Sequence, residues 1–131
     1  MGYISECDAE NNALRITWEG IVQDEVFEAR VAEGRRFLAS HAGSRGIIDF
    51  SGVTKFPSSD VIREIALQEP RGEEKSVVVI VAPQDSVFGS ARMFSILTES
   101  TRPNRHVVRT IEKAYELLRI RNPRFDPVEL I

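Results

Sequence analysis

Two adjacent serines, Ser58 and Ser59, stand where a predicted helix begins, directly after a strand-like segment and its loop. A serine at such a position caps the helix by accepting a hydrogen bond from a free backbone N–H group. It is also a candidate for phosphorylation, because the helix dipole and the free N–H groups stabilise a phosphate. In sheets flanked by helices, strand-to-helix loops of this kind are where ligands and partners usually bind. The segment is therefore a candidate site.

A second group of residues that could take part in binding consists of basic side chains. Arg102, Arg105, His106 and Arg109 fall within eight residues of one another. Such a cluster could hold a phosphate or a carboxylate. The alternative, which the sequence favours, is a solvated edge strand whose charges repel other strands. The remaining histidine, His41, falls at the end of the first predicted helix, where an imidazole suits the helix dipole.

No residue pattern supports catalysis, a metal or a cofactor. Segment 88–91 lacks the second glycine of a nucleophile elbow and falls inside a predicted helix. Cys7 has no nearby histidine and is expected to pack as a small apolar side chain. Two isolated histidines do not make a zinc site, and the glycines form no phosphate-binding pattern. We therefore expect a protein that is not an enzyme, with no metal and no cofactor.

The composition is that of an ordinary globular chain. Its 131 residues suit one domain, 1–131, and 42% of them are hydrophobic and 28% charged. A net charge of −3 gives no field that attracts nucleic acid. The longest apolar run, Val77–Ala82, has the length of a strand and not of a membrane span. The N-terminus lacks the pattern of a secretory signal, so we expect a cytoplasmic protein.

Strand-like and helix-like segments alternate along the chain. The expected strands are 3–7, 13–18, 46–50, 76–81 and 106–109, and the expected helices are 24–42, 59–68, 87–97 and 111–118. Asp24 is the expected cap of the first helix, and Val26, Ile96 and Leu97 are expected to face the core. This order predicts an α/β fold with a four- to five-stranded, mainly parallel sheet, an antiparallel N-terminal hairpin and about four helices.

Four local expectations accompany this fold. The run 77–81 has no alternation, which is typical of a central parallel strand covered on both faces. Segment 71–75 is expected to be a solvated turn, and Gly20 is expected to end the N-terminal hairpin. The C-terminal extension, 119–131, contains two prolines that prevent it from continuing the last helix, so we expect it to pack on the surface.

The element order and the segment around Ser58 together resemble the STAS fold of anti-sigma factor antagonists. In that family a strand commonly ends in Asp-aliphatic-Ser. An Asp-Ser-Ser-Gly motif follows, and a partner kinase phosphorylates its first serine. Asp49-Phe50-Ser51 matches the strand end, and Ser58-Ser59 falls at the serine pair. Pro57 and Asp60 stand where the motif has Asp and Gly. The resemblance implies that Ser58 is the phosphorylation position.

The chain resembles more closely the STAS-like, Sec14-like group of small bacterial proteins. The segments that carry this resemblance are 82–83, 87–94 and 109–114, and the resemblance spans Tyr3 to Leu118. The group has no common assigned activity, so the resemblance implies the fold and leaves the function open.

Two hypotheses for the function follow. The first is a non-enzymatic regulatory module that binds a protein partner through residues 54–62. Its predicted binding residues are Asp49, Ser51, Thr54, Ser58 and Ser59. The second is a carrier or sensor of a small apolar or lipid-like ligand, bound between the sheet and the third helix by Phe88, Met93 and Phe94. Such a carrier needs an internal cavity of roughly a few hundred Å³. A homodimer is compatible with either hypothesis.

Overall fold

A computed structural model describes residues 2–41, 43–70 and 72–130. Its elements are β1 Tyr3–Asp8, β2 Ala13–Ile21, α1 Asp24–Ser40, β3 Arg45–Lys55, α2 Ser59–Ala66, the 3₁₀ turn η1 Glu73–Lys75, β4 Val77–Val81, α3 Asp85–Leu97, β5 Arg105–Val108, α4 Ile111–Leu118 and β6 Asp126–Pro127. The predicted α/β fold is confirmed. Ala42, the last residue of the predicted first helix, and Arg71, in the predicted turn, lie outside the described residues.

The described strands form one six-stranded sheet in the order β5-β4-β3-β2-β1-β6. β1 and β2 form the predicted antiparallel hairpin, whereas β2, β3, β4 and β5 run parallel. β4 lies between two parallel neighbours, and Val79 and Val81 have no exposed surface. The unalternating run is thus a strand covered on both faces, as predicted. β5 is at the edge of the sheet, also as predicted.

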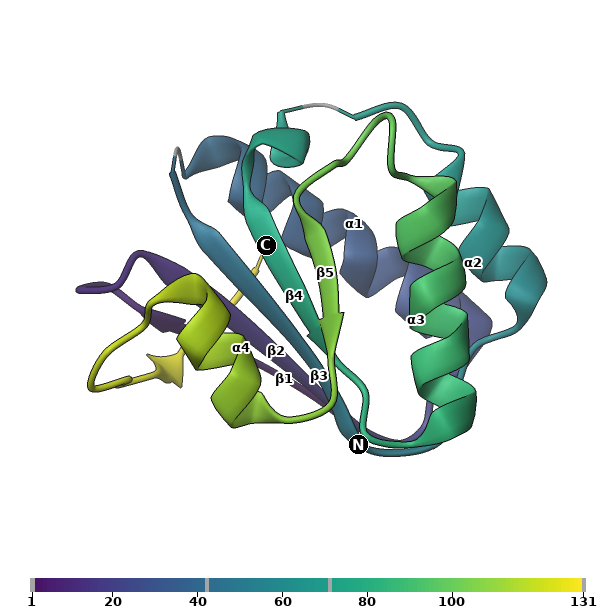
Figure 1. Ribbon diagram of the computed structural model, residues 1–131, viewed down its shortest axis with the longest axis horizontal. Coiled ribbons are helices and arrows are strands. Elements are labelled where there is room, and N and C mark those ends of the chain that lie inside the picture. The colour runs from purple at the N-terminus through teal and green to yellow at the C-terminus, as the bar shows by residue number, and fades with distance from the viewer. Residues whose placement is uncertain (1, 42, 71, 131) are drawn as a thin grey trace.

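The helices lie on both faces of the sheet (Figure 1). α1, α2 and α3 share one core with Trp18, Phe50 and Ile80, and α4 covers the other face over Ile47 and Val79. Three apolar helix residues that were predicted to face the core are instead exposed: Val26 (41%), Ile96 (62%) and Leu97 (41%). Helical spacing alone placed them on the inner face, but each of these helices packs on its neighbours through a narrower stripe than the pattern suggested.

β3 is longer than the predicted strand 46–50. It continues to Lys55 because β2 also continues past Gly20 to Ile21, and the two strands pair to their ends. The register shifts twice on this stretch, so that β3 carries two residues more than β2. Such bulges let a polar, glycine-containing segment stay in a sheet and increase its local twist. The predictions that Gly20 ends the hairpin and that this strand ends at Phe50 were therefore wrong.

The C-terminal extension packs on the domain, as predicted. β6 pairs with β1, and the Val128 N–H donates to the Ser5 carbonyl at 3.0 Å. Leu130 is buried in the core that α1 covers. On the other face, the guanidinium of Arg15 lies 4.2 Å from the centre of the Phe125 ring. These contacts hold the extension along β1.

Asp8, at the end of β1, should make stability depend on pH. This buried carboxylate accepts hydrogen bonds from the backbone N–H of Arg124 (2.9 Å) and from the backbone and side chain of Asn11 (3.1 and 2.8 Å). The Arg124 bond, together with those from Asn11, lowers the pKa of Asp8. We expect Asp8→Asn to reduce the free energy of unfolding by about 2 kcal/mol at neutral pH.

The sign of the pH effect follows from linkage. A carboxyl whose pKa is lowered by folding stabilises the protein above its unfolded pKa of about 4, and this contribution is lost as the pH falls through the folded pKa. The difference between wild type and Asp8→Asn in urea unfolding should therefore shrink at pH 3. Asp126→Asn, at an exposed carboxylate, is the control. An Asp8→Asn difference that is the same at pH 7 and pH 3 would contradict the prediction.

Candidate functional site

Ser58, and not Ser59, is the N-cap of α2. Its hydroxyl oxygen accepts a hydrogen bond from the Val61 N–H at 3.3 Å, and its backbone is extended. The four apolar residues of the helix, Val61, Ile62, Ile65 and Ala66, are all buried as predicted. Ser59 is the first residue of the helix and is exposed. The cap thus orients α2, and its hydroxyl is at the surface.

Asp24 has a different role from the predicted one. It is the first residue of α1 and not its cap, which is Gln23 without a side-chain bond. The Asp24 carboxylate instead accepts hydrogen bonds from the Ser58 N–H (2.9 Å) and from the Ser58 hydroxyl (2.7 Å). These bonds, the backbone one first, and the charge of Lys55 lower the pKa of Asp24. Asp24 therefore ties the start of α1 to the start of α2.

Because the Ser58 hydroxyl both caps α2 and binds Asp24, its removal should lower stability through two lost hydrogen bonds. We expect Ser58→Ala to lower the free energy of unfolding by about 1 to 2 kcal/mol, through the lost cap and the lost bond to Asp24. Ser59→Ala, at the exposed neighbour, should change it by less than about 0.5 kcal/mol. Urea unfolding of both variants measures the difference. A larger loss for Ser59→Ala would contradict the assignment of the cap.

Asp49 and Ser51 lie apart from Ser58. Side chains alternate along a strand up to the bulge, so Asp49 points to the α4 side, as Ile47 does, whereas Phe50 points into the core under α1 and α2. The two polar residues bind each other: the Ser51 N–H donates to Asp49 Oδ1 at 2.9 Å and its hydroxyl to the same oxygen at 2.5 Å. The structure thus separates the predicted binding residues into two groups.

The carboxyl ends of the parallel strands meet at one edge of the sheet, at the bottom of Figure 1. Side-chain hydrogen bonds connect the segments that meet at this edge. The Gln84 side-chain amide donates to the carbonyls of Ser51 (2.8 Å) and Val53 (3.1 Å). Arg109 donates to Asp85 Oδ1 at 2.7 Å. We define the carboxyl-edge surface by its exposed residues Ile21, Thr54, Lys55, Ser58, Ser59 and Asp60. Ile21, which is 68% exposed beside Lys55, is its apolar member.

At the opposite end of β4 lies a buried ionic cluster that the sequence did not predict. Glu73 was expected in a solvated turn, and Arg102 and Arg105 on a solvated edge, but their side chains are buried. Oε2 of Glu73 accepts hydrogen bonds from Nε of Arg35 (3.0 Å) and from Nε of Arg102 (3.1 Å). Arg105 donates to the backbone carbonyls of Ser76 (2.6 Å) and Glu73 (3.0 Å). We call Arg35, Glu73, Arg102 and Arg105 the Glu73 cluster.

The histidines do not join this cluster. His106 is exposed on β5. His41 follows the last residue of α1 and stacks on Phe37, with 3.9 Å between the ring centres. Its Nδ1 also lies 2.8 Å from the Phe37 carbonyl oxygen. His41 thus has the structural position expected from the sequence, at the C-terminal end of the first helix.

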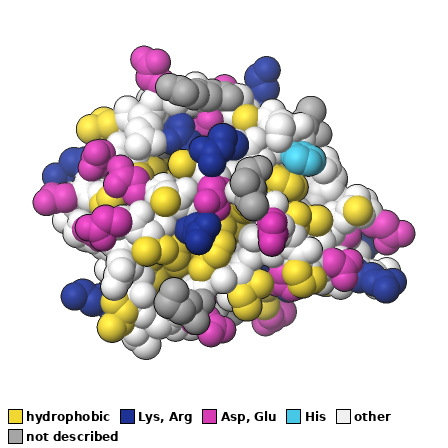
Figure 2. All heavy atoms as spheres, turned by 180° about the vertical axis from the view of Figure 1, so that it is seen from behind, with side chains coloured by type: hydrophobic (Ala, Val, Ile, Leu, Met, Phe, Trp, Pro, Cys, Tyr) yellow, Lys and Arg dark blue, Asp and Glu magenta, His cyan; other side chains and the backbone are white. Residues whose placement is uncertain are grey.

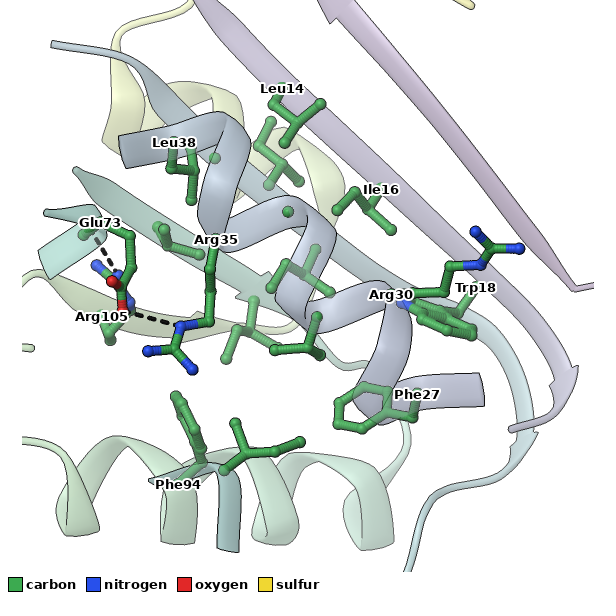
Figure 3. A pocket seen from close by; sticks show the side chains of 18 of the residues that line it. Leu14, Ile16, Trp18, Phe27, Arg30, Arg35, Leu38, Glu73, Phe94 and Arg105 are labelled. Carbon is green, nitrogen blue, oxygen red and sulfur yellow. Dashed lines mark hydrogen bonds and ion pairs between the residues drawn. The ribbon is translucent and has the colours of Figure 1, made fainter. Parts of the chain in front are cut away.

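Two apolar cavities lie between the sheet and the helices. The inner cavity, of about 90 Å³, is bounded by the sheet, α1 and the Glu73 cluster. The second, of about 70 Å³, lies toward α2 and α3. Phe94 lines both, and it points from α3 toward Arg35 (Figure 3). Phe88 and Met93 line neither cavity; Phe88 instead carries Arg109 on its ring at 3.9 Å. Both volumes are below the few hundred Å³ expected of a carrier.

Searches against family models, curated proteins and solved structures find no match to this chain. Membership of the STAS-like group therefore stays a prediction. Within the described ranges, no group of three or more histidine, cysteine or acidic side chains could hold a metal ion. None of the helices in the same ranges is long and apolar enough to cross a membrane.

Proposed function

We propose that this protein is a non-enzymatic, STAS-like interaction module that binds a protein partner through its carboxyl-edge surface. The observation that carries the proposal is the tie between Asp24 and Ser58, which fixes the start of α2 against the start of α1. A surface that is already ordered loses little conformational entropy on binding. Thr54, Ser59 and Asp60 are exposed on it, beside the apolar side chain of Ile21.

The proposed binding does not depend on a phosphate. The Ser58 hydroxyl already donates to the Asp24 carboxylate, and Asp60 adds a second negative charge in the first turn of α2. A phosphate on Ser58 would meet Asp24 with like charge and break this contact. Phosphorylation of Ser58 stays a prediction, and mass spectrometry after incubation with the cognate kinase tests it. Unmodified Ser58 and Ser59 would contradict it and leave partner binding open.

Partner capture from the native cytoplasm, with mass spectrometry of the retained proteins and small molecules, tests the main proposal. We expect a partner that wild type retains and Thr54→Arg loses at least tenfold in affinity, measured afterwards with the purified partner. Glu10→Arg is the control, since Glu10 is exposed in the β1–β2 turn at the other end of β2. Equal binding by Thr54→Arg and Glu10→Arg, or no retained protein, would contradict the proposal.

A second candidate function is the binding of a small apolar ligand inside the domain. It is supported by the two cavities that meet at Phe94, whose linings are almost entirely apolar away from the Glu73 cluster. Apolar cavities in proteins stay dry, and one of about 150 Å³ holds benzene. Each cavity here is smaller than that, so the volumes favour a compact ligand no larger than benzene over a long-chain lipid.

A further inference from the structure

The inner cavity has one polar end. Its apolar walls come from β2, β3 and α1, and at one end it is lined by all four residues of the Glu73 cluster. Figure 3 shows Glu73, Arg35 and Arg105 gathered at this end, with Leu38 and Phe94 close to them and Trp18 and Phe27 at the other end. Tyr3 and Arg30 also line the cavity away from this end, and the rest of its lining is apolar. A cavity that is mostly apolar and has an ionic cluster at one end matches the shape of an amphiphilic molecule.

The charges at this end do not balance. Three guanidinium groups, those of Arg35, Arg102 and Arg105, gather around the carboxylate of Glu73, and the negative charge of Glu74 also acts on Arg105. Burial, followed by the positive charge of Arg102, lowers the pKa of Arg105 to about 10, so that this group is still protonated at neutral pH. The polar end thus carries an excess of positive charge in a buried position, where an anion is attracted more strongly than in water.

One buried donor at this end lacks a partner. Arg102 is only 3% exposed, and its Nε and Nη2 atoms donate to Glu73 Oε2 (3.1 Å) and to the Gln68 carbonyl (3.0 Å). Its Nη1 atom makes no hydrogen bond to any of the described residues. A buried guanidinium N–H without an acceptor destabilises the protein, and more so than a neutral group because it is charged. Native proteins rarely leave such a group without a role.

We propose that the inner cavity binds a small organic monocarboxylate, with its apolar part against Phe94 and Leu38 and its carboxylate on Arg102. The proposal rests on the second candidate function and adds the class of ligand to it. A carboxylate would supply both the missing acceptor and the missing negative charge, and arginine binds carboxylates through charge-assisted hydrogen bonds. The inner cavity alone is smaller than one that holds benzene, so the apolar part is at most a benzene ring that extends past Phe94 toward the second cavity.

A surface groove lies next to this end of the cavity. The groove, of about 480 Å³, lies between α1 and the side chains of Gln68, Glu69 and Glu73, and it shares Arg35 and Glu73 with the inner cavity. Arg35 also donates to the Glu69 carbonyl at 3.0 Å, and it therefore forms the wall between groove and cavity. The face that carries α1 is the front of Figure 2, where apolar side chains reach the surface beside basic and acidic ones.

Calorimetric and NMR titrations with three probes test the proposal on the wild-type protein. Benzoate has both parts of the proposed ligand, benzyl alcohol has only the apolar part, and inorganic phosphate has only the charge. We expect benzoate to bind at least tenfold more tightly than benzyl alcohol, and phosphate to bind more weakly than benzoate. Equal binding of benzoate and benzyl alcohol would overturn the carboxylate inference and support the apolar-ligand function alone. No binding of either would overturn both.

Two variants locate the site. Arg102→Met keeps an unbranched apolar stem without the guanidinium charge and should abolish the preference for benzoate. Val31→Phe, at a residue that lines both cavities, should fill them and abolish binding of both aromatic probes. Val26→Phe, on the exposed side of the same helix, is the matched control and should bind as wild type does. Unchanged binding of benzoate by both Arg102→Met and Val31→Phe, with melting temperatures that show folded proteins, would overturn the site.

If Arg102→Met does not fold, the comparison of benzoate with benzyl alcohol on wild type still shows whether the carboxylate contributes to binding. Val31→Phe still shows whether the ligand binds in the cavity. Phosphate binding as tight as that of benzoate would indicate an anion site without an apolar part, and would overturn the inference.

Discussion

Replacement of Glu73 by glutamine is expected to lower the free energy of unfolding by about 3 to 5 kcal/mol, the usual cost of removing one partner from a buried ion pair. Glu73 is 1% exposed, and its Oε2 accepts from both Arg35 and Arg102. The amide keeps the shape of the side chain but leaves the guanidinium charges without a counter-ion. Since small domains are stable by only about 5 to 15 kcal/mol, this change removes a large part of the total.

Urea unfolding at pH 7 measures the effect, and Glu69→Gln is the matched control. Glu69 stands on the same loop with an exposed side chain, so its replacement should change stability by less than about 0.5 kcal/mol. A loss below 1 kcal/mol for Glu73→Gln would mean that the arginines are held by other groups. It would also weaken the argument that the cluster has an excess of positive charge.

Truncation of Phe50 to alanine should cost about 3 to 5 kcal/mol, because it removes a buried ring and leaves a cavity. Phe50 is 2% exposed and packs edge-to-face on Phe56, with 4.8 Å between ring centres, and against Phe27 at 6.2 Å. It also stands at the first bulge of β3 and lines the second cavity, which the substitution would enlarge. The carboxyl-edge surface depends on this part of β3.

Leu67→Ala is the control for this truncation, because Leu67 is 73% exposed at the end of α2 and should cost less than about 0.5 kcal/mol. Thermal unfolding of both variants tests the difference. A Phe50→Ala loss similar to that of Leu67→Ala would show that the core under β3 collapses around the missing ring.

The two proposed binding sites lie at opposite ends of β4. The Glu73 cluster contacts Ser76, just before the strand, whereas Gln84 of the carboxyl edge follows it. A variant at one end should therefore leave binding at the other end unchanged, and sites with no shared contacts usually act independently. This separation lets each proposal be tested without the other.

Much of the fold could be predicted from local patterns. The unalternating run of β4, the alternation of Leu14, Ile16 and Trp18 in β2 and the cap of α4 at Thr110 depend on neighbours within a few residues. The Thr110 hydroxyl accepts from the Lys113 N–H at 3.2 Å, three residues away. Propensity and periodicity describe contacts of this range well. The position of Ser58 at the start of a helix could be predicted for the same reason.

The sequence by itself thus determined the order of elements, the parallel sheet with its antiparallel hairpin, and the serine at the start of α2. Only the tertiary structure decided that Asp24 binds Ser58, 34 residues away, and that Glu73 meets Arg102, 29 residues away. Charged residues on a turn and on an edge strand have the same local pattern whether solvent or another charge faces them. Their burial depends on which segments the sheet brings together, and the cavity beside them depends on how closely α1 and α3 pack over it.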